Sequence, residues 1–207
     1  MNREELLKNA KPILFNTEMV QAILDGRKTV TRRKIDRDIT NFCDVEVDGT
    51  LLDYQNCHGD FINPVDLCRY KVGDILYVRE TWSIHECVKC QAGMPALGGE
   101  CKCEYVYRAS YGATDFRRKP SIHMPKEAAR IFLKVTDVRV ERLQDITEED
   151  AIAEGMSKTL VDGVVFISAK GNFHVFWDSL NIKRGYGWDA NPWVWVIEFE
   201  KIEREEE

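Results

Sequence analysis

The stretch ILDGRKTVTRR, residues 23–33, places a hydroxyl group among closely spaced cations. Its basic residues are Arg27, Lys28, Arg32 and Arg33. A hydroxyl such as that of Thr31 can act as a nucleophile or position a water, and nearby cations can receive an electron-rich group. Because the chain is acidic overall, with a net charge of −6, this local positive charge predicts a site for a phosphate or a base carbonyl. The alternative is a solvated edge strand whose charges deter aggregation.

Strand geometry limits how the residues of this stretch can cooperate. In a regular strand, Lys28 and Thr31 would point to opposite faces. The sequence predicts a short helix that ends near Leu24, and Gly26 suits the left-handed conformation that follows such an end. For Lys28 and Thr31 to share a site, Lys28 must lie in the turn after Gly26, with the strand proper beginning at about Thr29.

Other candidates for substrate contacts lie at predicted strand ends and in a loop between prolines. They are Glu80, Trp82, Tyr107, Arg108, Ser121 and His123. Aromatic rings can stack on a base and an arginine can bind a phosphate, while a rigid loop such as KPSIHMP often carries function. Packing at the mouth of a barrel is the alternative for the aromatic residues.

Four cysteines are concentrated within a short Gly-rich segment. They are Cys87, Cys90, Cys101 and Cys103. Two close pairs of thiolates can form a tetrahedral shell around zinc, and with all four positions filled by protein such a zinc would be structural. Free thiols or a redox pair are the alternatives. No feature of the sequence indicates an organic cofactor.

The remaining pattern predicts an α+β protein. Five or six strands alternate with loops, and short helices are expected near residues 147–154 and 172–181. The final apolar run, WVWVIEFEKI, is apolar on both faces and predicts a strand that is central or part of a closed barrel. No apolar run is long enough to cross a bilayer and the N-terminal residues lack a secretion signal, so we predict a cytoplasmic protein without membrane contact.

The motif made by Gly26, Lys28, Thr31 and Arg33 resembles the signature of the ASCH domain, G-x-K-x-x-E-x-R. Further resemblance comes from the segments KVGDILYVRETW, RRKPSIHMPKEAARI, ITEEDAIAEGM and WDANPWVWVIEF, which look like those of bacterial and phage-borne ASCH proteins. The resemblance implies a small, PUA-like mixed β-barrel with short helices at its rim. It implies a single domain over residues 1–207, with a hairpin insertion at 36–66 and a Cys-rich insertion at 85–103.

Position 31 is threonine where the general ASCH signature has glutamate. In this respect the chain is similar to a small bacterial branch of the family, the N4-acetylcytidine amidohydrolases, which have GRKTITIR where this chain has GRKTVTRR. The resemblance implies catalytic roles for Lys28, Thr31 and Glu154. The hydroxyl could attack or position a water, the lysine could be a base or an oxyanion partner, and the glutamate could be the base or hold the lysine.

Three functional hypotheses follow. The first is a protein that binds RNA or a modified nucleoside and hydrolyses the N4-acyl amide of a cytidine. The second is a non-catalytic module of phage origin that reads RNA or a modified base. The third is a ribonuclease, in which Lys28 or His123 would activate the 2′-hydroxyl. A broad nucleic-acid coat is disfavoured by the acidic composition.

Overall fold

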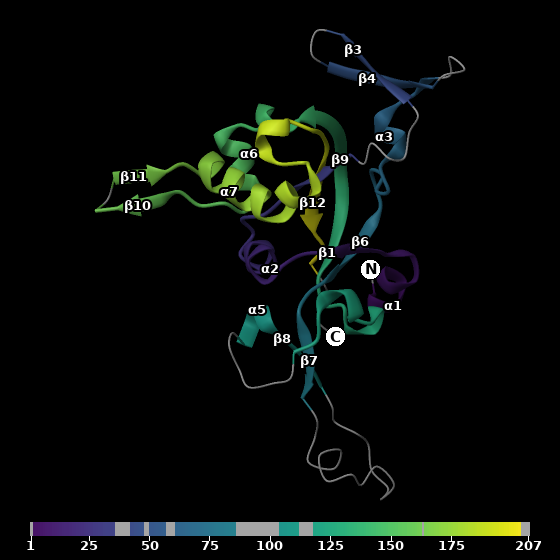
Figure 1. Cartoon of the computed structure of the whole chain (residues 1–207). Coiled ribbons are helices and arrows are strands. Elements are labelled where there is room, and N and C mark those ends of the chain that lie inside the picture. The colour runs from purple at the N-terminus through teal and green to yellow at the C-terminus, as the bar shows by residue number, and fades with distance from the viewer. Residues whose placement is uncertain are drawn as a thin grey trace, which may run out of the picture. The chain divides into compact units, whose positions relative to one another are not determined.

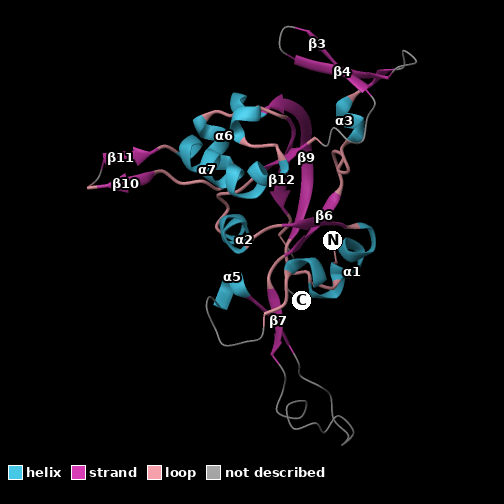
Figure 2. Ribbon diagram, viewed as in Figure 1, coloured by secondary structure: helices cyan, strands magenta, loops and turns pink. Residues whose placement is uncertain are grey.

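The computed structural model describes residues 2–35, 42–47, 50–56, 61–85, 104–111, 118–162 and 164–203. These residues form helices and strands in comparable amounts (Figures 1 and 2). The main sheet has the strand order β1 (Lys11–Leu14), β6 (Ile75–Arg79), β9 (Phe132–Arg142), β12 (Trp193–Lys201) and β2 (Val30–Lys34). It is mostly antiparallel, and its order is linear and not closed. The mixed α and β class is therefore confirmed, whereas the closed barrel stays a prediction.

Three smaller sheets complete the described strands. They are β3 (Phe42–Val47), β4 (Thr50–Asn56) and β5 (Phe61–Ile62); β7 (Trp82–His85) and β8 (Glu104–Tyr107); and β10 (Thr159–Val161) and β11 (Val164–Ile167). The antiparallel pairing of β3 with β4 is the pairing that the hairpin prediction for residues 36–66 implies.

The described helices are short except for one of 13 residues. They are α1 (Arg3–Asn9), α2 (Thr17–Leu24), α3 (Pro64–Leu67), α5 (Arg108–Tyr111), α6 (Glu148–Ala153) and α7 (Ala169–Asn181). Across the described ranges, no helix has both the length and the apolar character that a membrane span requires.

The chain separates into two compact units that interleave in sequence. The first unit comprises Met1–Asp25, Ile75–Leu133 and Ile202–Glu207, and the second comprises Gly26–Asp74 and Lys134–Lys201. The prediction of one domain over residues 1–207 stays a prediction.

The first unit is built on the parallel pair of β1 and β6. Both strands are largely apolar, and Ile13, Leu76 and Val78 are buried. A second apolar cluster in this unit includes Leu6 and Phe132. The antiparallel pair of β7 and β8 belongs to the same unit and carries several of the residues predicted to contact substrate.

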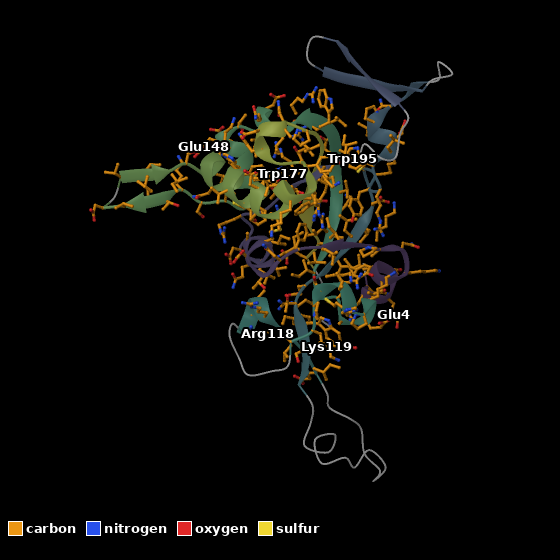
Figure 3. The ribbon with its side chains drawn as sticks, viewed as in Figure 1. Glu4, Arg118, Lys119, Glu148, Trp177 and Trp195 are labelled. Carbon is orange, nitrogen blue, oxygen red and sulfur yellow. The ribbon has the colours of Figure 1, made fainter. Side chains whose placement is uncertain are left out.

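The second unit is built on the antiparallel pair of β12 and β2. Val194 and Val196 of β12 pack with Phe173 and Trp177 of α7 in the core of this unit, where Figure 3 labels Trp177. Alternate residues of β12 on the other face, such as Ile197, are also buried. β12 lies between β9 and β2 in the strand order, so its prediction as a central strand is confirmed.

Candidate active site

The turn before β2 brings the predicted lysine to the end of α6. Gly26 has a φ of 73°, a left-handed conformation that other residues adopt at a cost. Beyond it, the Nη1 of Arg27 donates to the main-chain oxygen of Gly155 (3.1 Å), and Lys28 forms an isolated antiparallel bridge with Glu154. Lys28 therefore precedes the strand proper, as the alternation argument predicted.

The ammonium group of Lys28 is buried and fully engaged. Its Nζ donates to the main-chain oxygen of Val30 (2.7 Å), to the main-chain oxygen of Glu154 (2.9 Å) and to the Oε2 of Glu154 (2.7 Å). The two charged side chains are 0% and 2% exposed. Burial lowers the pKa of Lys28 from its ordinary value, and the charge of Glu154 opposes this shift.

The same pair closes the outer edge of β2. The main-chain oxygen of Thr29 and the main-chain N–H of Ile35 form hydrogen bonds with β12. Because these groups alternate in direction along an antiparallel strand, the main-chain groups of Val30 and Arg32 face away from β12. Lys28 donates a hydrogen bond to the carbonyl of Val30, and the Oε1 of Glu154 accepts one from the main-chain N–H of Arg32 (2.6 Å). Two side chains thus satisfy the polar edge of an end strand that would otherwise be open to pairing.

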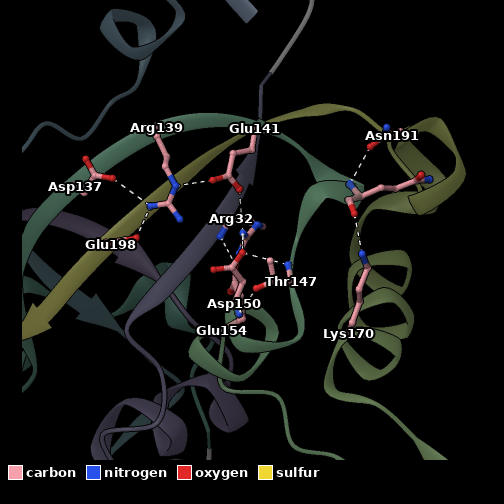
Figure 4. Close-up of polar contacts among 11 residues, drawn as sticks. Arg32, Asp137, Arg139, Glu141, Thr147, Asp150, Glu154, Lys170, Asn191 and Glu198 are labelled. Carbon is pink, nitrogen blue, oxygen red and sulfur yellow. Dashed lines mark hydrogen bonds and ion pairs between the residues drawn. The ribbon is translucent and has the colours of Figure 1, made fainter. Parts of the chain in front are cut away.

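Arg32 extends the ion pair into a network (Figure 4). Its buried Nη2 donates to the Oε2 of Glu141 (3.1 Å) and to the Oδ2 of Asp150 (3.0 Å), and its Nη1 lies 3.6 Å from the Oε1 of Glu154. Burial alone would raise the pKa of Asp150, but the N–H of Thr147 and the charge of Arg32 together lower it. The Nε and Nη1 of Arg32 have no hydrogen-bond acceptor within the described part of the chain.

Asp150 has a second role at the start of α6. Its carboxylate accepts from the main-chain N–H of Thr147 (3.2 Å), while the Thr147 hydroxyl accepts from the N–H of Asp150 (3.0 Å). This capping box was visible in the sequence as a threonine followed by an aspartate three residues later. The sequence did not reveal that the capping carboxylate also binds an arginine.

Arg139 on β9 joins the network from its outer side. Its Nε donates to the Oε1 of Glu141 (2.5 Å), and its Nη1 contacts Asp137 (3.1 Å) and Glu198. These carboxylates raise the pKa of Arg139 despite partial desolvation. The network joins three cations to five carboxylates, so its formal charge is negative rather than positive. The cations within it are therefore matched by the protein's own carboxylates.

Thr31 and Arg33 lie on the same strand as Arg32, but their side chains are on the other face of that strand. Side chains alternate along β2, so both lie on the face opposite to that of Arg32. Thr31 is 1% exposed. Burial lowers the pKa of Arg33, against the opposing influence of Tyr70 and Glu154. The structure thus places all three predicted catalytic residues in the interior of the second unit, with Lys28 and Glu154 in direct contact.

A second polar cluster lies in the first unit and contains two predicted residues. The buried carboxylate of Glu80 accepts two hydrogen bonds from Arg130, at 2.8 and 2.9 Å. The guanidinium of Arg130 also lies 4.1 Å from the ring centroid of Tyr107 and donates to the Oγ of Ser110 (2.7 Å). Burial raises the pKa of Tyr107, whose hydroxyl donates to the main-chain oxygen of Ala128 (2.6 Å). Sequence reasoning missed Arg130. The only indication of its role in the sequence is its position as a single cation before the apolar strand that follows it.

The other predicted residues of the first unit have varied surroundings. Trp82 is buried in an apolar cluster, which matches the packing alternative, and the Nζ of Lys119 lies 4.8 Å from its ring centroid. Arg108 begins α5 and is exposed. Ser121 is half-buried and His123 is exposed in a 3₁₀ turn that they share. Substrate contact by these residues stays a prediction.

The cysteines predicted to bind zinc lie outside the described residues. They are Cys87, Cys90, Cys101 and Cys103. Within the ranges that the structure describes, no group of three or more His, Cys, Asp or Glu side chains is arranged to hold a metal ion. The zinc site therefore stays a prediction from the sequence.

Comparisons with known proteins return no relative. No family model matches the chain, and no curated protein and no solved structure matches it significantly. The functional argument consequently depends on the residues and their geometry, together with the motif resemblance.

Proposed function

We propose that this chain is an ASCH-type, PUA-like protein that binds RNA or a modified nucleoside and hydrolyses the N4-acyl amide of a cytidine. The observation that carries the proposal is the 2.7 Å contact between Lys28 and Glu154, which lie 126 residues apart in sequence. The motif resemblance selected these two residues together with Thr31, and it made no use of spatial information. Their contact supports the idea that they act as one unit.

The proposed chemistry assigns one task to each side chain. Burial lowers the pKa of Lys28, which makes release of a proton from its ammonium group easier than from an exposed lysine, and we assign the role of general base to the resulting amine. We assign to this amine the proton of the attacking oxygen, which is the Thr31 hydroxyl or a water that this hydroxyl positions. Glu154 holds the lysine through two of its oxygens. The attacking oxygen adds to the acyl carbonyl, the C–N bond breaks, and the proton passes from Lys28 to the leaving amine of the cytidine. If water attacks, the acyl group leaves as the carboxylic acid; if Thr31 attacks, a water then hydrolyses the acyl-threonine ester and restores the hydroxyl.

A non-catalytic module is the second candidate, and one observation favours it. In the structure the Lys28 side chain is 0% exposed and its Nζ already donates to three protein oxygens. A lysine in this state serves well as a structural support for the edge of β2. On this reading the domain binds a nucleoside or RNA without changing it, and the lysine shapes the strand that carries the neighbouring cations.

Turnover of N4-acetylcytidine, followed by chromatography of the nucleosides, separates the two candidates. Thr31→Val removes the buried hydroxyl at nearly constant volume, and Thr31→Ser retains it. Thr29→Val is the matched control, because Thr29 belongs to the same stretch and is exposed. We expect cytidine to form with the wild-type, Thr31→Ser and Thr29→Val proteins and not with Thr31→Val. Full activity in Thr31→Val would remove this residue from the mechanism.

Absence of turnover by folded wild-type protein would favour the binding module. Calorimetric titration with N4-acetylcytidine and with a short RNA would then identify the ligand, and the affinity for RNA should fall with salt through a few phosphate contacts. Cleavage of RNA with no action on the free nucleoside would instead indicate the ribonuclease, which requires a phosphodiester.

A further inference from the structure

Arg32 is buried as completely as an apolar core residue. Its side chain is 0% exposed. The amidohydrolase motif GRKTITIR has isoleucine where this chain has Arg32, so the resemblance provides no role for the arginine. Burial of a charged guanidinium costs free energy unless charged partners offset that cost. The partners of Arg32 therefore indicate what it does.

These partners connect both ends of α6 to β2. The Nη2 of Arg32 donates to the Oδ2 of Asp150 (3.0 Å) in the first turn of α6, and also to Glu141 of β9 (3.1 Å). Its Nη1 lies 3.6 Å from the Oε1 of Glu154, the residue that caps the other end of the helix (Figure 4). The main-chain N–H of Arg32 donates to the same Oε1 (2.6 Å). One residue thus holds both the helix and its terminal carboxylate against the strand.

The carboxylate of Glu154 is shared between two cations. Its Oε1 faces Arg32, and its Oε2 accepts from the Nζ of Lys28 (2.7 Å). The three side chains are at most 2% exposed, so water and salt screen their charges weakly. When Lys28 releases its proton, the carboxylate still has the guanidinium as a countercharge, because arginine stays protonated. A buried pair of lysine and glutamate alone would favour the ammonium form.

The other charges around Lys28 agree with this division of roles. Burial is the largest cause that lowers the pKa of Lys28, and the carboxylate of Glu154 opposes it. The charges of Arg33 and Arg32 lower this pKa further. Burial raises the pKa of Tyr70, the neighbour of Arg33, so its phenol adds no charge at neutral pH. The two arginines are therefore the charges that favour the neutral lysine.

We propose that Arg32 is a positioning residue for the amide hydrolysis, which holds Glu154 in place and supplies its countercharge while Lys28 is neutral. This inference rests on the proposed function. Because its guanidinium is buried, Arg32 acts through Glu154 and not by contact with the substrate. Lys28 takes a proton from the attacking oxygen and returns it to the leaving amine, so Arg32 itself neither gains nor loses a proton.

The pH profile of turnover separates this role from structural support alone. Arg32→Gln removes the charge, and it should lower kcat for N4-acetylcytidine at pH 7 by about tenfold or more, because general-base catalysis typically contributes about 10²–10⁴-fold. KM should stay within about twofold, since contacts with the substrate are retained. The rise of kcat with pH should move to higher pH in Arg32→Gln and much less in Arg32→Lys, which keeps the charge. Arg184→Gln changes an exposed arginine outside the site and should match the wild-type protein.

Carbon-13 NMR of protein labelled at the ε-carbon of lysine provides a measurement that requires no turnover. The resonance that is absent from Lys28→Met belongs to Lys28. Its titration midpoint should move to higher pH in Arg32→Gln, because this variant lacks a neighbouring positive charge. A folded wild-type protein that does not act on N4-acetylcytidine would refute the proposed function, whereas the titration would still test the countercharge.

Circular dichroism establishes that each variant is folded. If Arg32→Gln does not fold, its combination with Asp150→Asn, which removes one of the carboxylates left without a partner, takes its place. A titration midpoint of Lys28 that stays the same or falls in the variant without the arginine would overturn the proposal. A wild-type pH profile of kcat in that variant would also overturn it, because Arg32 would then have a structural role only.

Discussion

Replacement of Lys28 by methionine removes the ammonium group at little cost in volume. It leaves the carboxylate of Glu154 buried with only the Arg32 contacts, and it leaves the carbonyl of Val30 without its lysine donor. Breaking a buried ion pair on one side typically costs about 3–5 kcal/mol, because the remaining charge stays desolvated. For a chain of this length each kcal/mol lowers the melting temperature by about 2–4 °C.

We therefore expect Lys28→Met to lower the free energy of unfolding by about 3–5 kcal/mol and the melting temperature by about 6–20 °C. Urea titration followed by circular dichroism gives the free energy, and a thermal scan gives the melting temperature. Lys183→Met is the matched control, since this lysine is exposed, and it should change stability by less than about 0.5 kcal/mol. A loss below about 1 kcal/mol in Lys28→Met would refute the reasoning from burial.

The pH dependence of the stability difference between the wild-type protein and Lys28→Met tests the direction of the pKa shift of Lys28. Burial lowers the pKa of Lys28 in the folded state from its ordinary value of 10.5. Between the lowered pKa and 10.5, the unfolded chain holds a proton that the folded chain has released, so stability rises with pH. The advantage of the wild-type protein over Lys28→Met should grow through this window, by at most about 1.4 kcal/mol per pH unit. If the stability advantage of the wild-type protein stayed constant or shrank as pH rises, a lowered pKa of Lys28 would be contradicted.

Three further predictions concern the turn, the capping box and the cysteines. Gly26→Ala should cost about 1–2 kcal/mol through its left-handed backbone alone, because a β-carbon there meets no atom within 4 Å, and Gly26→Asn should cost less in the same denaturation assay. Asp150→Asn should lose about 1–3 kcal/mol at neutral pH. That difference should shrink as pH falls below 3.8, because the pKa of Asp150 is lowered in the folded state. Elemental analysis should find one zinc per chain, lost in Cys87→Ser; a metal-free wild-type protein would favour free thiols.

Local signals in the sequence were sufficient to predict several elements near the candidate site. The capping box at Thr147 and the glycine after α2 are short-range patterns, and both mark helix ends that the structure contains. The position of Lys28 before the strand followed from side-chain alternation together with the condition that Lys28 and Thr31 share a site. These predictions succeeded because each depends on neighbouring residues only.

Long-range partners were beyond the reach of the same reasoning. Arg130 and Glu80 lie 50 residues apart, and Arg32 and Glu141 lie 109 residues apart. Any of the many acidic residues could have been the partner of a given arginine, because charge pairing has no sequence periodicity. The contact of Lys28 with Glu154 was selected only through the resemblance, and the balance of cations by carboxylates was not anticipated.

The pairing of β2 with β12 has a consequence for synthesis of the chain. Lys28 and Glu154 both precede residue 155, yet β2 depends on residues 194–198 for its strand partner. A chain cut after Asn181 would contain Lys28, Thr31 and Glu154 but lack the strand that pairs with β2. Ribosomes must therefore complete β12 before β2 can pair, so a chain that ends before residue 194 should not assemble the contact between Lys28 and Glu154, although it contains both residues.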